Sequence, residues 1–209
     1  MKAAIHAFKY DRLHPAARGL GRMLAQAIAQ LAGEAPEEML VVPVPLHRSK
    51  HAERGFNQAR ALADSALGFL RKSHPRWRLT LSSTALMRLR QTTSQAGLTS
   101  RQRRLNVRGA FAVSNIAAVD SKNILLIDDI FTTGATARAA AQALVKAGAA
   151  SVWVATLARA RRVNELYPGE FSPGADFQEN EFEFAAVGAN ANEGSTDSSD
   201  HSSQDQPSF

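Results

Sequence analysis

One stretch of this 209-residue chain decides its fold, Asn-Ile-Leu-Leu-Ile-Asp-Asp-Ile-Phe-Thr-Thr-Gly-Ala-Thr at residues 123–136. Its apolar residues 124–127 are typical of a parallel strand that is buried on both faces. Two carboxylates, Asp128 and Asp129, follow directly, and we expect them where that strand ends. Ligands of open α/β sheets bind at the carboxyl ends of strands, so the stretch predicts an α/β fold with a binding site at this edge.

The loop after the two acids is rich in hydrogen-bond donors. The hydroxyls of Thr132, Thr133 and Thr136 can converge on a phosphate, together with backbone N–H groups of the loop and of the following helix. We expect that helix to begin after Ala135, and Gly134 allows a close approach of the backbone. Each charge-assisted bond contributes about 1.5–3 kcal/mol net, so several can hold a phosphate dianion without lysine. The alternative is a plain strand-end turn followed by a helix cap.

The order of these residues resembles a known signature. An apolar strand, Asp-Asp, two further residues and Thr-Thr-Gly-x-Thr are similar to the phosphoribosyl diphosphate motif of type I phosphoribosyltransferases. The resemblance implies that Asp128 and Asp129 are the catalytic pair, which contacts the ribose 2- and 3-hydroxyls directly or through Mg²⁺. It also implies that the 5-phosphate is bound by Thr132, Thr133, Gly134, Ala135 and Thr136.

Two further segments resemble the ComF family of competence-associated phosphoribosyltransferase-like proteins. Residues 42–48 and 54–58, Val-Pro-Val-Pro-Leu-His-Arg and Arg-Gly-Phe-Asn-Gln, are similar to its diphosphate-binding region. The implied diphosphate contacts are Leu46, His47, Arg48 and Arg54. Residues 88–111 resemble the mobile hood loop of that family, with implied contacts from Arg88, Arg90, Thr92, Gln95, Arg101, Arg104 and Asn106. Because diphosphate loops of similar enzymes often hold a cis peptide, we expect one at Leu46–His47 or its neighbour.

The chain departs from the family at its start. Many members begin with a zinc ribbon of four cysteines, whereas this chain has none, so no zinc of that kind is expected and Mg²⁺ is the implied metal. Either the ribbon was lost or the true start lies upstream, and the sequence leaves both open. No segment approaches the roughly 18 apolar residues of a membrane span, and residues 1–10 do not resemble a signal peptide, so we expect a cytoplasmic protein without membrane insertion.

Charge divides the chain into two parts. Up to Arg162 there are 25 basic and 9 acidic residues, whereas ten acidic residues and no Lys or Arg follow it. We therefore predict a phosphoribosyltransferase-like domain at 1–162, a C-terminal extension at 163–187 and a disordered acidic tail at 188–209. The tail is either a passive appendage or an arm that masks a basic face. Self-association into a homo-oligomer is left open.

The basic residues gather in one region. No carboxylate occurs between Asp64 and Asp120, but ten cations do: Arg71, Lys72, Arg76, Arg78, Arg88, Arg90, Arg101, Arg103, Arg104 and Arg108. A ligand with a 5-phosphate and a diphosphate would explain some of them. Single-stranded DNA would explain the excess, with Trp77 or Phe111 as stacking platforms, although aromatic residues are sparse.

Periodicity predicts the remaining elements. Helical spacing of apolar residues indicates helices from Pro15 to Gly33 and over residues 56–70 and 137–148, and strands are expected at 39–45, 79–86, 110–113, 123–127 and 151–157, the last one. Alternating strands and helices predict a mainly parallel sheet flanked by helices. Two functions stay open: transfer of a phosphoribosyl group to an unidentified nitrogen acceptor, or non-catalytic ligand sensing with a link to single-stranded DNA or the competence machinery.

Overall fold

The computed structural model describes residues 14–91, 99–131, 133–160 and 182–187. In chain order its elements are α2 (His14–Ala29), β1 (Glu38–Pro43), α3 (Arg48–Arg54), α4 (Gln58–Ser73), β2 (Arg78–Leu81), β3 (Leu86–Arg88), α5 (Ser100–Val107), β4 (Phe111–Val113), the 3₁₀ turn η1 (Ile116–Ala118), β5 (Asn123–Phe131), α6 (Ala135–Lys146), β6 (Ser151–Ala160) and β7 (Phe182–Val187). The predicted tail at 188–209 and residues 163–181 of the predicted extension lie outside these ranges, so that division of the chain stays a prediction.

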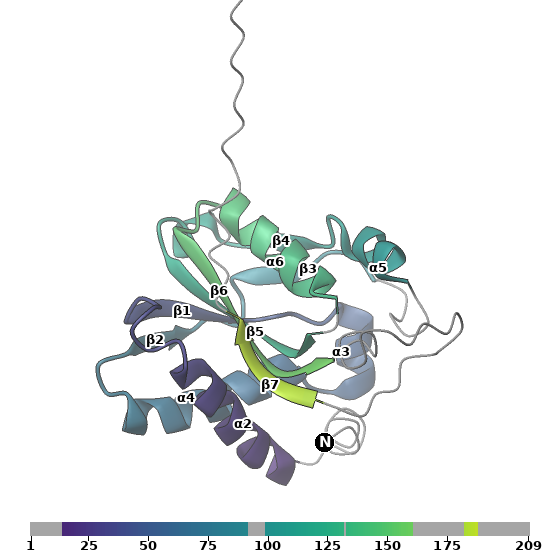
Figure 1. Ribbon diagram of the computed structural model, residues 1–209. Helices are drawn as coiled ribbons and strands as arrows, with labels where there is room; N and C mark the ends of the chain where they lie inside the picture. Colours follow the sequence, from purple (N-terminus) through teal and green to yellow (C-terminus); the bar gives the residue numbers. More distant parts are fainter. Residues whose placement is uncertain (1–13, 92–98, 132, 161–181, 188–209) are drawn as a thin grey trace, which may run out of the picture.

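The main sheet has the strand order β2-β1-β5-β6-β7 (Figure 1). Strands β2, β1, β5 and β6 run parallel, and only β7, drawn in yellow beside β6, runs antiparallel to its neighbour in this sheet. The predicted α/β class with a mainly parallel sheet is therefore confirmed. The signature strand β5 occupies the centre, where Ile124 to Ile127 are fully buried.

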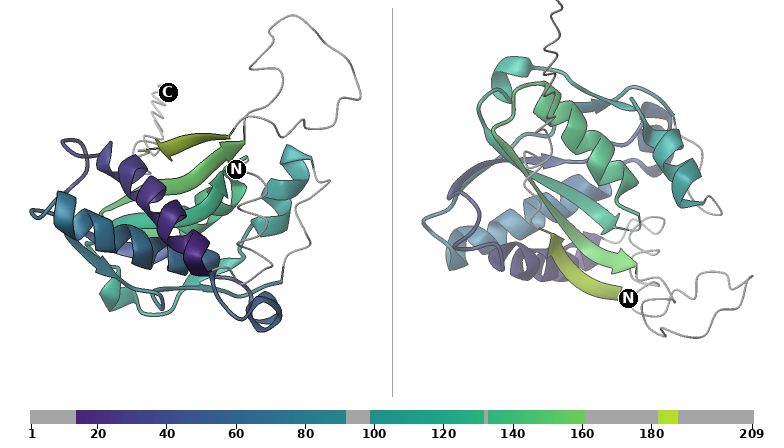
Figure 2. Two further views of the ribbon diagram at one scale, coloured as in Figure 1. Left: turned by 90° about the horizontal axis from the view of Figure 1, so that it is seen from below. Right: turned by 45° about the horizontal axis from the view of Figure 1, so that its top comes forward.

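Helices cover both faces of the sheet. In the left view of Figure 2, α2 and α4 lie side by side across one face, where they pack on Leu125 and Ile127 of β5. Helix α6 covers the other face and packs on Ile124 and Leu126. The two helices α2 and α4 approach closely at Gly21, where an added Cβ would lie 2.3 Å from the side chain of Ser65. Successive residues of β5 thus serve opposite cores, as strand geometry requires.

A second, two-stranded sheet pairs β3 with β4 in antiparallel register and carries α5 between its strands in the chain. We call β3, α5 and β4 the hood. Phe111 of β4 and Leu86 of β3 belong to the same buried cluster as the inner face of α6. The hood therefore packs on the α6 side of the main sheet (Figure 1).

Three sequence expectations about strands are wrong. The strand predicted at 79–86 is two strands in different sheets, because the polar residues 82–84 separate the edge strand β2 from β3. Strand β6 is not the last strand in the chain, since β7 follows it. The signature strand does not end at the two acids but continues to Phe131, because β6 is long enough to pair with it up to the Phe131–Arg159 register.

Most of the helix predictions are confirmed, whereas the predicted cis peptide is not present. Helix α4 buries the predicted apolar stripe. Helix α2 ends at Ala29, four residues before the predicted end at Gly33, which lies with φ 97° in the turns that follow the helix. All peptide bonds from Pro45 to Arg48 are trans, so the expectation of a cis bond there is wrong. Among the described helices, none combines the length and the apolar character that crossing a bilayer requires.

Candidate functional site

Two of the predicted motifs meet at one edge of the sheet. Strands β1 and β5 run parallel with Pro43 opposite Ile127, so both end at the same side. Directly beyond β1, the Val44 N–H donates to the Ile127 carbonyl over 2.8 Å. The segment of residues 44–47 that leaves β1 is therefore held beside the first acid of β5. This contact joins the diphosphate motif to the signature motif.

The acid pair lies near the end of β5, where the alternation of side chains is irregular. Side chains alternate regularly up to Ile127, but Ile127 and Ile130 both pack on the cluster of α2 and α4, whereas Phe131 packs on the cluster of α6. The alternation of β5 therefore shifts by one residue within the stretch that holds the two acids. Each carboxylate is held locally, since Asp128 Oδ1 accepts from the Asp129 N–H (2.9 Å) and Asp129 Oδ1 accepts from the Ile130 N–H (2.8 Å). Both acids are half-buried, so their remaining carboxylate oxygens lie near the ligand edge of the sheet without being part of the core.

The start of α6 offers uncapped amides. Its N-cap residue is Gly134, with φ 69°, and no side chain caps the helix. An added Cβ on Gly134 would lie 2.5 Å from the ring of Phe131, so both the conformation and the space select glycine. The Oγ1 of Thr133 is buried with no hydrogen-bond partner. Ala135 and Thr136 follow in the first turn of α6, and N–H groups at a helix start are the kind of donor that anion sites use. Thr132 lies outside the described residues.

The predicted diphosphate residues lie on a loop and a short helix. His47 is the N-cap of α3, and its Nδ1 accepts from the Ser49 N–H at 3.3 Å. Leu46 is half-buried beside it, and Arg48 is exposed in the first turn. Arg54 ends α3, and its guanidinium donates to Gln58 Oε1 over 3.4 Å. The structure therefore adds a capping role for His47, and its predicted ligand contact stays a prediction.

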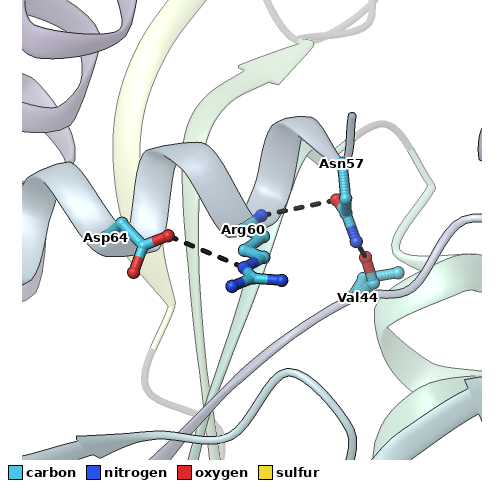
Figure 3. Close-up of polar contacts among 4 residues, drawn as sticks. All are labelled: Val44, Asn57, Arg60 and Asp64. Atoms are coloured by element: carbon cyan, nitrogen blue, oxygen red, sulfur yellow. Dashed lines mark hydrogen bonds and ion pairs between the residues drawn. The ribbon is translucent and has the colours of Figure 1, made fainter. Parts of the chain in front are cut away.

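Two residues at the start of α4 were quoted in the sequence motif without a role. Asn57 caps α4 by accepting from the Arg60 N–H (3.4 Å), and its Nδ2 donates to the Val44 carbonyl (3.0 Å), as Figure 3 shows. Gln58 is 2% exposed. The capping role of Asn57 could have been predicted from the sequence, because Asn directly before an amphipathic helix is a preferred N-cap residue. Its second contact to the loop after β1 depends on the tertiary structure.

The hood brings one arginine to the acids. Arg88, at the end of β3, places its guanidinium 5.3 Å from the centre of the Phe111 ring. Burial lowers the pKa of Arg88 from its ordinary value, and the Asp128 carboxylate acts in the opposite direction, so the two groups lie close enough to interact. Arg88 is thus the hood cation that accompanies the face of β5 on which Asp128 lies.

The other predicted hood residues are described only in part. Arg90 is exposed and donates to the Arg108 carbonyl, Arg101 is exposed in the first turn of α5, and Asn106 is half-buried. Thr92 and Gln95 lie outside the described residues, as does the side chain of Arg104. The structure therefore brings Arg88 to the site and leaves the placement of the remaining hood contacts as predictions.

The site fits a magnesium ion that is held mainly by a ligand. Within the described part of the chain, no group of three or more His, Cys, Asp or Glu side chains is arranged to hold a metal. Mg²⁺ usually keeps several waters and binds through one or two carboxylates together with phosphates of the substrate. Asp128 and Asp129 supply that kind of oxygen ligand.

Comparison with known proteins identifies the family of the chain. The family model described as Phosphoribosyl transferase domain matches residues 10–168. The chain belongs to this family. DNA utilization protein YhgH of Escherichia coli O6:H1 is 32% identical over 157 residues, which cover 74% of this chain and 65% of that protein. Competence protein F of Haemophilus influenzae is 29% identical over 159 residues (75% and 66%), and Competence protein ComFC of Bacillus subtilis is 37% identical over 124 residues (59% and 45%).

These relatives confirm the resemblance to ComF proteins, and the chain spans about two thirds or less of their length. A solved structure of glutamine phosphoribosylpyrophosphate amidotransferase from Bacillus subtilis aligns with 69% of this chain and 26% of that one, at 25% identity and a TM-score of 0.40.

Proposed function

We propose that this ComF-family chain binds phosphoribosyl diphosphate together with Mg²⁺ and transfers the phosphoribosyl group to a nitrogen acceptor that is not yet identified. One observation carries the proposal: α6 begins without a side-chain cap, beside the buried, unpartnered Thr133 hydroxyl and directly after the acid pair. Uncapped helix amides with an adjacent hydroxyl suit a phosphate, and two carboxylates at a strand end suit ribose hydroxyls.

The residues divide the work of a displacement at the anomeric carbon. In that reaction the bond from this carbon to the diphosphate oxygen breaks while a bond to the acceptor nitrogen forms. Donors of the α6 start would hold the 5-phosphate, and the acids would orient the ribose. Arg48 and Arg54, the first and last residues of α3, would stabilise the negative charge of the departing diphosphate. Bound Mg²⁺ would neutralise part of the same charge.

The hood supplies a means of shielding the reaction. Arg88 reaches from β3 towards Asp128, so the hood already contributes a cation to the ligand edge. A cover that excludes water would protect the activated ribose from hydrolysis before the acceptor attacks. This role remains part of the proposal.

Calorimetry tests the proposal first. We expect phosphoribosyl diphosphate to bind the full chain in the presence of Mg²⁺, and more weakly with the metal removed. Diphosphate release should then be measured across a panel of nucleobases and amines to find the acceptor. Binding without turnover on any acceptor would favour ligand sensing, and no binding at all would overturn the proposal.

A second function is favoured by charge. Residues 65–119 contain ten cations and no carboxylate, and among them Arg90, Arg101 and Arg108 are exposed on the hood or next to it. The names of the relatives, DNA utilization protein and Competence protein, point the same way. Single-stranded DNA would bind such a surface mainly through its phosphates. Fluorescence anisotropy with a labelled oligonucleotide at several salt concentrations would test this, and no binding at low salt would exclude it.

A further inference from the structure

The loop after β1 is joined to β5 by a backbone hydrogen bond, and Val44 at its start is buried in the cluster beneath α6. Residues 44–47 form no regular element, and their link to β5 is the 2.8 Å bond from the Val44 N–H to the Ile127 carbonyl. The Val44 carbonyl points elsewhere and must also be satisfied, because Val44 is 5% exposed. The partner of this carbonyl therefore decides how firmly the loop is held.

That partner is Asn57, which uses both ends of its side-chain amide. Its Oδ1 caps α4 through the Arg60 N–H, and its Nδ2 donates to the Val44 carbonyl over 3.0 Å (Figure 3). The contact spans 13 residues of chain and joins a 16-residue helix to the loop. A rigid helix with a buried apolar face is thus the anchor of a loop that has no regular structure.

The next residue anchors a cation of the same motif. Gln58 follows Asn57, is 2% exposed, and accepts from the Arg54 guanidinium through Oε1 at 3.4 Å. Burial fixes the rotamer of Gln58, so the direction of its bond to Arg54 is fixed as well. The first turn of α4 therefore holds the loop backbone with one side chain and the arginine at the end of α3 with the next.

We infer that Asn57 and Gln58 are positioning residues for the diphosphate side of the ligand. The inference rests on the proposed function. Asn57 sets residues 44–47 against β5 directly before Asp128, and Gln58 orients Arg54. Neither residue needs to touch the ligand. Their effect on affinity comes from the preorganisation of groups that do.

Two substitutions of Asn57 separate positioning from helix stability. Asn57→Ser keeps a good N-cap oxygen but is too short to reach the Val44 carbonyl, whereas Asn57→Ala removes both contacts. We expect both variants to bind phosphoribosyl diphosphate with Mg²⁺ about tenfold more weakly, which corresponds to about 1.4 kcal/mol. Thermal unfolding should show a smaller loss of stability for Asn57→Ser than for Asn57→Ala.

The matched control is Asp64→Asn on the same helix. Asp64 forms an exposed ion pair with Arg60 at 3.7 Å, so its loss should change neither ligand affinity nor loop structure measurably.

A double-mutant cycle tests the role of Gln58. The losses of ligand affinity in Gln58→Leu and Arg54→Gln should be non-additive, since both changes remove the oriented Arg54 guanidinium.

Hydrogen exchange measured without ligand tests directly whether Asn57 holds the loop, whether or not the protein turns over a substrate. Hydrogen exchange of the amides of residues 44–48 should speed up in both Asn57 variants and stay unchanged in Asp64→Asn. Unchanged exchange in Asn57→Ser, or full affinity in Asn57→Ser with a loss only in Asn57→Ala, would overturn the positioning role. If the unmodified chain binds no phosphoribosyl diphosphate while exchange responds as expected, the proposed function fails, and the role in ligand positioning fails with it.

Discussion

The helices differ in how their first N–H donors are satisfied, and α6 differs from α3, α4 and α5 in this respect. His47, Asn57 and Thr99 each cap their own helix with a side chain, and Thr99 does so within a reciprocal capping box with Gln102. Helix α6 begins at a glycine without any side-chain cap, beside the buried Thr133 hydroxyl, which has no partner. Three helices thus use a side chain to satisfy one of their own N–H donors, whereas the start of α6 has no such cap.

Substitution of the acid pair next to α6 should have the largest effect on ligand binding. Asp128→Asn together with Asp129→Asn should abolish Mg²⁺-dependent binding of phosphoribosyl diphosphate, since amides neither attract the metal nor accept as strongly from ribose hydroxyls. The fold should persist, because both side chains are half-buried near the carboxyl end of β5 rather than fully buried in the core. Calorimetry and circular dichroism check the two parts, and unchanged affinity would remove the basis of the site assignment.

Gly134→Ala should have the next largest effect. A non-glycine residue at φ 69° costs about 1–2 kcal/mol, and the new Cβ would also push the Phe131 ring that lies 2.5 Å from its position. Both changes shift the amides that face the phosphate, so ligand affinity should fall with stability. The control is Gly33→Ala, at φ 97° with open space around its Cβ, which should cost stability alone. Equal affinity losses in the two variants would contradict a phosphate role for the α6 start.

A pair of threonines sharpens the comparison directly. Thr133→Val removes the unpartnered hydroxyl and should weaken ligand binding about tenfold with little loss of stability, since no bond inside the protein is broken. Thr99→Ala should do the reverse and cost about 1 kcal/mol of stability without a change in affinity, because Thr99 caps α5 within the chain. Thermal unfolding and calorimetry on both variants check this. A loss of affinity in Thr99→Ala, or full affinity in Thr133→Val, would contradict the comparison.

The smallest effect concerns the acidic end of the chain. Strand β7 pairs with β6, so a truncation that tests the tail should end after Val187 and keep that strand. If residues 188–209 mask the basic face, their removal should raise affinity for single-stranded DNA modestly and steepen its salt dependence. Exposed ion pairs are individually worth only about 0–1 kcal/mol, so the difference should vanish at high salt. Identical salt slopes for the two proteins would identify the tail as passive.

Local patterns were sufficient for the class of fold and for the strand and turn that carry the candidate site. The run Ile124 to Ile127 predicted the central parallel strand, and Gly134 predicted the turn into α6, because burial and backbone conformation leave few alternatives for such residues. The apolar stripe of α4 was equally clear. Each of these signals is carried by neighbouring residues.

Contacts between distant segments could not be predicted in the same way. The extension of β5 beyond the acids depends on the length of β6, and the placement of β3 and β4 in a separate sheet depends on which partners their edges find. The second bond of Asn57, to a carbonyl 13 residues earlier, exists only because β1 and α4 are packed together. No local propensity encodes such pairings.

The sequence by itself determined that the chain carries a strand, two acids and a donor-rich loop in the order of the phosphoribosyltransferases, because that order is a property of consecutive residues. Only the tertiary structure decided that the alternation of β5 shifts at the acid pair, that Arg88 lies close enough to Asp128 to interact with it, and that Asn57 holds the loop after β1. The physical reason is that faces, burial and long-range hydrogen bonds arise when segments pack. A ligand site is made by that packing from residues that the sequence keeps far apart.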